Sequence, residues 1–184
     1  AIYINNYTQA TTFDISVKGT PFTSFSFVND IDLTSIVFDG EFTNVNLFGN
    51  SILENINVSL LYDLEILDVQ NCKLQSLDVT KNVALTSLVC NNNELTTLNV
   101  SNNTLLEKFY CNNNQLSKIN VTSNTQLKEL NLSDNMLSAL NLRNNTALVS
   151  LYISNNADIS IVNLKENKAL QTLYAQGLSI GDID

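Results

Sequence analysis

The sequence repeats itself with a period of 21 residues, and this period constrains the fold more than any other feature. Leucines recur at positions 64, 85, 106, 127 and 148, and Leu170 follows after 22 residues. A period of this length is typical of arrays in which each repeat buries its apolar face only against its neighbours. The sequence therefore predicts a solenoid with one repeat per coil.

Apolar residues and asparagines recur in register within each repeat, as L-x-x-L-x-[VCLI]-x-x-N-x-L-x-x-L-x-V-x-x-N. Inward and outward residues alternate around Leu88 and again around Leu98, which indicates a strand followed by a second extended segment instead of a helix. One repeat shows all the shared positions: Leu85, Leu88, Cys90, Asn93, Leu95, Leu98, Val100 and Asn103.

These positions resemble the leucine-rich repeat family, whose strand signature is L-x-x-L-x-L-x-x-N/C-x-L. The period, the cysteine at an inner strand position and the back half "LNVSNNT" are most similar to bacterial internalins of the cysteine-ladder kind, the internalin J type. The resemblance covers residues 42–184 well and 1–41 poorly. It implies a right-handed, curved solenoid, mostly β, with parallel strands on the concave face and short extended segments on the convex face.

The chain divides into three parts of one continuous domain. Residues 64–184 hold the regular repeats of 21 or 22 residues, and residues 22–63 hold degenerate ones. Residues 1–21 alternate Phe13, Ile15 and Val17 with polar side chains, so we expect a β-rich N-terminal cap that covers the first coil. Internalins carry a helical cap, and here the sequence departs from them.

The cysteines fit a structural role better than a chemical one. Cys90 and Cys111 occupy the same inward position in adjacent repeats, where parallel strands aim both Cβ atoms the same way, a poor geometry for a disulfide. We interpret both as small core residues, and Cys72 as a replacement in an asparagine position. The sequence has no histidine, and we expect neither a metal site nor a cofactor.

Three columns of asparagine recur with the repeat. The first is expected to be a buried ladder that hydrogen-bonds backbone N–H and C=O groups lying away from water: Asn93, Asn114, Asn135 and Asn156. The other two are expected to turn the chain, since asparagine tolerates left-handed backbone angles. They are Asn71, Asn92, Asn113, Asp134 and Asn155, and Asn82, Asn103, Asn124, Asn145 and Asn167.

Any binding function should lie on the outward strand positions, because the inward ones are committed to packing. One outward column reads Ser26, Asn46, Asp68, Val89, Tyr110, Asn131, Tyr152 and Tyr174. Tyrosines among amides and hydroxyls are typical of binding surfaces, although tyrosine is also a good strand former. We therefore predict a concave binding patch with no catalytic residue, made of Tyr110, Tyr152, Tyr174, Asp68, Val89 and Asn131, with Lys108 and Glu129 beside them.

Composition narrows the class of function. A net charge of −9 repels a nucleic-acid backbone, the absence of histidine disfavours enzymes, and no apolar run is long enough to insert into a membrane. The resemblance implies an adhesin-like binding module for a protein or glycan, host-derived or cell-surface, in a secreted or surface-displayed bacterial protein whose signal peptide we expect to have been removed. Two alternatives remain: a polysaccharide-acting enzyme on a parallel β-solenoid, and a structural spacer.

Overall fold

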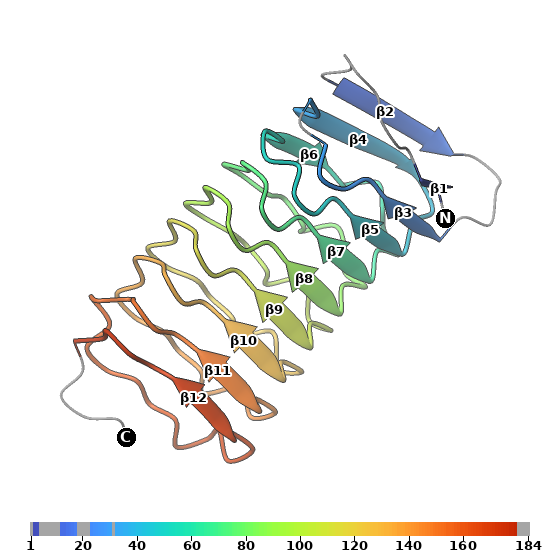
Figure 1. Cartoon of the computed structure of the whole chain (residues 1–184). Coiled ribbons are helices and arrows are strands. Elements are labelled where there is room, and N and C mark those ends of the chain that lie inside the picture. The colour runs from blue at the N-terminus through green and yellow to red at the C-terminus, as the bar shows by residue number, and fades with distance from the viewer. Residues whose placement is uncertain (1, 4–11, 18–22, 31, 180–184) are drawn as a thin grey trace.

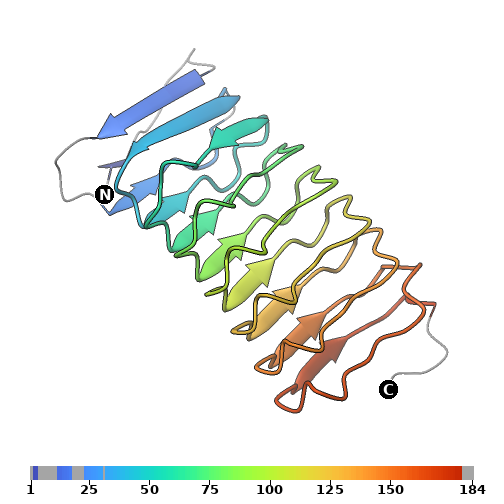
Figure 2. The same cartoon turned by 180° about the vertical axis from the view of Figure 1, so that it is seen from behind.

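The computed structural model describes residues 2–3, 12–17, 23–30 and 32–179, and within them the chain forms a parallel β-solenoid without a helix. Figures 1 and 2 show the coils stacked side by side in one elongated array, with β1 and β12 at opposite ends of the larger sheet. Because the described residues contain no helix, they also contain none that could span a membrane.

Two parallel sheets run along the solenoid (Figure 1). We call the outer side of the larger sheet the strand face and the opposite side of the coils the back face. The smaller sheet, on the back face, consists of β2 (Thr12–Val17), β4 (Ser35–Gly40) and β6 (Asn55–Asn57). The larger sheet consists, in spatial order, of β1 (Ile2–Tyr3), β3 (Ser24–Ser26), β5 (Asn44–Asn46), β7 (Ile66–Asp68), β8 (Ser87–Val89), β9 (Lys108–Tyr110), β10 (Glu129–Asn131), β11 (Ser150–Tyr152) and β12 (Thr172–Tyr174).

The first part of the chain adds strands to both sheets. β1 pairs in parallel with β3, and β2 pairs in parallel with β4. The cap expected over residues 1–21 falls partly outside the described residues, and it stays a prediction.

The core follows from the alternation in each short strand. The middle residue of β8, Leu88, is fully buried, while Ser87 and Val89 on either side are half-buried. The same inward column continues through Phe109 and Leu130, so the leucine-type positions of successive coils form one apolar core. Burial of this apolar surface is the main force that holds the coils together.

The buried asparagine ladder has the predicted role. Asn93 donates from Nδ2 to the carbonyls of Val69 (2.8 Å) and Cys90 (3.1 Å), and its Oδ1 accepts the Leu74 N–H at 2.9 Å. Equivalent bonds recur in the three following coils, made by Asn114, Asn135 and Asn156.

The ladder also extends beyond the residues that we predicted. Asn50 donates to the carbonyls of Phe27 and Leu47 and accepts the Asp30 N–H. One coil later Cys72 takes the position and donates from sulfur to the Leu47 carbonyl at 3.3 Å. Its thiol can make only part of the asparagine's bonds, because it has one weak donor and no amide oxygen.

The turn after each strand uses left-handed backbone, as predicted. The φ angles of Asn71, Asn92, Asn113, Asp134 and Asn155 lie between 53° and 58°. Gly49 and Gly177 occupy the same position in coils that lack an asparagine there, with φ of 77° and 68°. The column therefore needs residues that tolerate a positive φ, and asparagine and glycine do so at the lowest cost.

The third asparagine column is not the set of left-handed turn formers that we expected, because none of its members has a positive φ. It is a second buried ladder. Asn103, which is fully buried, donates to the Val79 carbonyl at 2.9 Å and to the Asn82 carbonyl at 2.8 Å. The amide oxygens of this column are buried without a hydrogen bond from the described residues: Asn82, Asn103, Asn124, Asn145 and Asn167.

The cysteines are unpaired in the structure. Cys90 and Cys111 are fully buried in the core column, and Cys72 is half-buried. Burial raises the pKa of the Cys72 thiol to about 12 and raises that of Cys90 well above its ordinary value. The thiols of Cys72 and Cys90 are therefore held in the neutral, unreactive form. Asn91, which the strand alternation places on the outward side next to Cys90, is only 8% exposed.

Replacement of a ladder residue tests the role of the buried amides. Asn114→Ala should lower the free energy of unfolding by about 1–3 kcal/mol, because backbone groups in the core lose their partners. Urea unfolding measures the change. The matched control is Asn112→Ala, since the side chain of Asn112 makes no hydrogen bond to the described residues. Equal losses in both variants would contradict the role of the ladder.

Candidate functional site

The strand pairing sets the outward residues in columns on the strand face. Asp68 lies opposite Val89, which lies opposite Tyr110, and Tyr110 lies opposite Asn131. The column continues through Tyr152 and Tyr174 on β11 and β12. In the adjacent column, Lys108 lies opposite Glu129. The structure thus brings the eight predicted binding residues together on one face.

Tyr110 is held by its neighbours. Its hydroxyl donates a hydrogen bond to the Glu129 carboxylate, and the Lys108 ammonium lies 4.4 Å from the centre of its ring. Burial, and then the Glu129 carboxylate, raises the pKa of Tyr110 to about 12. These contacts fix the orientation of the ring before any ligand arrives.

Tyr152 and Tyr174 form a separate, more open pair. Their rings stack with centroids 5.1 Å apart and planes inclined by 10°. Tyr174 is 52% exposed, whereas Tyr152 is half-buried. Asn131 separates this pair from Tyr110 in the column, and its Oδ1 accepts the Ser133 N–H at 3.1 Å. The open edges and hydroxyls of the pair make it the most accessible aromatic part of the strand face.

Asp68 and Val89 form the other end of the site. The Asp68 carboxylate accepts hydrogen bonds from the backbone (3.1 Å) and the side chain (2.9 Å) of Gln70. β7, which carries Asp68, lies three strands from β10, which carries Glu129. At about 4.8 Å per strand this is roughly 14 Å, beyond the span of paired carboxylates in glycoside hydrolysis. Asp68 and Glu129 therefore do not form such a pair.

The described residues do not form a cluster of metal ligands. In the part of the chain that the structure describes, no three His, Cys, Asp or Glu side chains come close enough to hold a metal ion. The acids are instead engaged with neighbouring polar groups. Asp134, for example, accepts a hydrogen bond at 2.7 Å from Asn155 in the next coil.

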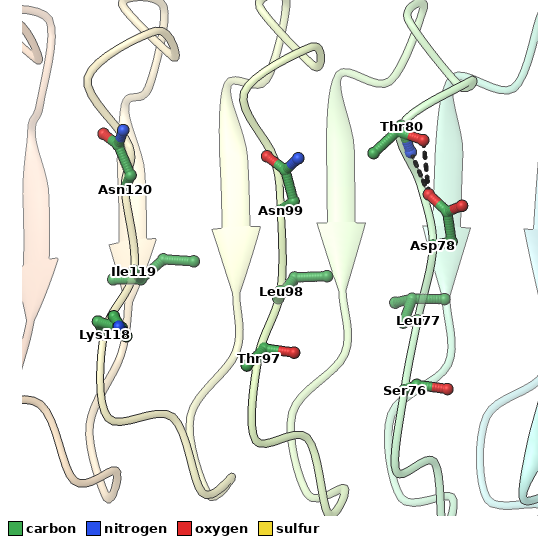
Figure 3. Close-up of a pocket in the computed structure, with 10 residues that line it drawn as sticks. All are labelled: Ser76, Leu77, Asp78, Thr80, Thr97, Leu98, Asn99, Lys118, Ile119 and Asn120. Atoms are coloured by element: carbon green, nitrogen blue, oxygen red, sulfur yellow. Dashed lines mark hydrogen bonds between the residues drawn. The ribbon is translucent and has the colours of Figure 1, made fainter.

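The sequence did not predict a hollow of about 660 Å³ on the back face, shown in Figure 3. Leu77, Leu98 and Ile119 line it in a row, one from each of three successive coils. The repeat places these residues inward, so nothing in the pattern marked them as accessible. A signal was nevertheless present in the outward residues around them, which are small or neutral polar apart from Asp78 and Lys118.

Comparison with known proteins identifies the class. The functional domain of InlJ from Listeria monocytogenes, which includes a cysteine ladder, superposes with a TM-score of 0.72 at 28% identity, over 88% of this chain and 34% of that one. InlF, an internalin from Listeria monocytogenes, gives 0.62 at 26% identity, over 82% and 44%. A leucine-rich repeat protein from Leptospira interrogans gives 0.67 at 19% identity, over 83% and 48%, and shows the fold alone.

Neither protein-family models nor curated proteins give a match to the sequence. The fold, its 21-residue coil and these likenesses define a leucine-rich repeat solenoid. More particularly, its coils are internalin-like repeats of the type that the InlJ domain shows. The chain spans between about a third and about a half of the length of the solved structures that it resembles.

The titration of Tyr110 tests the geometry of the strand face. Its pKa lies above the ordinary value of 10, so its neutral form stabilises the fold fully below pH 10, and this contribution is lost as the pH rises toward 12. Tyrosinate absorbance, compared between the wild type and Tyr110→Phe, should show one group that titrates near 12.

Glu129→Gln should lower the pKa of Tyr110 without bringing it to 10, because burial is the larger cause. Glu65→Gln, which removes the same charge beside β7, should leave it unchanged. A Tyr110 that titrates near 10 in the wild type would contradict the described contacts.

Proposed function

We propose that the chain is the ligand-binding module of a secreted or surface-displayed bacterial protein, and that it holds a protein partner on the strand face. The observation that carries the proposal is the stacked pair Tyr152 and Tyr174, of which Tyr174 is exposed, in one column with Tyr110. Tyrosines are enriched among the residues that dominate binding energy at protein interfaces. The likeness to internalins supports an interaction module of the leucine-rich repeat type.

The geometry of the tyrosines favours a protein over a glycan as the ligand of this face. A sugar stacks on an open ring face, but Tyr152 and Tyr174 turn one face of each ring toward the other. The edges, hydroxyls and outer faces of the rings are left for contact, and together these suit the mixed apolar and polar surface of a protein. Tyr110 adds to the surface at little entropic cost, because Lys108 and Glu129 already hold it.

The surroundings support a binding patch with a polar border. Asn131 lies between Tyr110 and Tyr152 in the column, and Asp68 lies at its far end beyond Val89, so amide and carboxylate groups stand beside the aromatic rings. The rigid backbone of parallel strands keeps these side chains in a fixed arrangement, which limits the conformational entropy lost on binding. No reacting group is needed for this role.

A binding screen against host glycoproteins, mucins and glycans tests the proposal. The double variant Tyr152→Ala/Tyr174→Ala should weaken binding of the protein ligand found in the screen by roughly tenfold or more, the loss typical of an interface hot spot. Surface plasmon resonance measures the affinity, and thermal unfolding checks that the variant is folded.

The matched control is Tyr62→Ala, which removes a tyrosine that is 59% exposed in the turn before β7, away from the column. It should bind like the wild type. A double variant that binds as tightly as the wild type would rule out the tyrosine pair as the anchor. A ligand lost equally in both variants would show that exposed tyrosine in general, and not this face, sets the affinity.

A further inference from the structure

The back-face hollow has an apolar floor and polar borders that are uncharged apart from Asp78 and Lys118. Leu77 and Leu98 are 7% and 9% exposed and form the floor with the half-buried Ile119. Figure 3 shows Asp78, Asn99 and Asn120 in a second row on one side of this floor. Its volume lies within the range of small-ligand sites, which combine apolar walls with a few placed polar groups.

The hollow begins where the back sheet ends. β6 (Asn55–Asn57) is the last strand of that sheet, and Ser76–Asp78 is the equivalent segment of the next coil. Among the described residues, no backbone hydrogen bond joins segments 75–78, 96–99 and 117–120 to one another. The backbone groups of these extended segments are therefore left for a ligand or solvent to satisfy.

The amides in the border have a fixed orientation. Asn99 accepts the Ser101 N–H on its Oδ1 at 3.1 Å, and Asn120 accepts the Thr122 N–H at 3.0 Å. Asp78 makes the same bond to Thr80 at 2.9 Å. Because these oxygens are tied to the backbone, the Nδ2 groups of the two asparagines are held in place, and neither donates to another described residue. They are preorganised donors.

We propose that this hollow binds a neutral glycan chain that lies along the solenoid axis across successive coils. The aliphatic floor suits the C–H faces of sugar rings, and the amides, with the hydroxyls of Ser76 and Thr97, suit their hydroxyl groups. The one lysine of the border, Lys118, balances Asp78, so the hollow itself favours no charge. The chain's net charge of −9 disfavours an acidic glycan.

The same row of side chains continues past the hollow. Asn141 and Asn163 bond the backbone two residues on, each at 3.1 Å, as Asn99 does. Both line a second hollow of about 330 Å³ beside Leu140, the next residue in the apolar row. A chain of repeating sugar units laid along the axis would therefore meet an apolar residue and a backbone-bonded asparagine in successive coils. A compact ligand would contact only one such set.

Charge-changing variants of the asparagine row test the proposal. Asn99→Asp and Asn120→Asp keep the oxygen that bonds the backbone but remove the Nδ2 donor, and the natural Asp78 shows that the turn accepts a carboxylate. Asn57→Asp is the matched control, since Asn57 makes the same bond to Ser59 at 3.0 Å on β6, outside the hollow. Calorimetry with neutral linear oligosaccharides of glucose, mannose and N-acetylglucosamine, and with polygalacturonate, gives the affinities.

Each hollow variant should weaken binding of a neutral oligosaccharide by roughly tenfold, while Asn57→Asp and the Tyr152→Ala/Tyr174→Ala variant should bind it like the wild type. Failure of every neutral oligosaccharide to bind would overturn the proposal. So would preferential binding of polygalacturonate, an equal loss in Asn57→Asp, or displacement of the oligosaccharide by an extended peptide. Loss only in the tyrosine variant would place the glycan on the strand face instead.

Discussion

The structure depends on the hydrogen bonds that buried asparagine amides make to the backbone. Each coil turns its chain inward after the strand, and the turn leaves N–H and C=O groups in an apolar interior where water cannot reach them. Asn114 satisfies these groups in its coil, because its amide donates to the carbonyls of Cys90 and Cys111 and accepts the N–H of Leu95. Loss of this amide would cost about 1–3 kcal/mol in all, because the carbonyls of Cys90 and Cys111 also accept from Asn93 and Asn135, whereas the Leu95 N–H would lose its partner.

The two ladders explain why the outward residues form straight columns. The first ladder ties the turn after each strand to the coil before it, and the second, through residues such as Asn103, does the same at the far side of the coil. From residue 85 to residue 156, each regular coil is thus fixed to its neighbour at two places, and the strands between them cannot slip in register. Val89, Tyr110 and Asn131 therefore stand opposite one another.

The repeat made much of this predictable from sequence. Asn114 could be assigned to a buried ladder because it recurs at a position flanked by inward apolar residues. Asn103 was misassigned because it has the same residue type and the same period as a turn former such as Asn92, and only the backbone angle and burial distinguish them. The hydrogen bond between Tyr110 and Glu129 depends on side-chain rotamers, which the repeat pattern does not encode. The hollow at Leu98 depends on where the back sheet ends, which the pattern does not encode either.

The ladder account is tested most directly by amide hydrogen exchange, resolved by residue with NMR. The N–H groups of Leu74, Leu95, Leu116 and Leu137 should exchange as slowly as those of the strands, because ladder oxygens accept them. The N–H of Leu98, which has no partner among the described residues, should exchange much faster. If Leu95 exchanged as fast as Leu98, the ladder would not be what satisfies these backbone groups and fixes the coils in register.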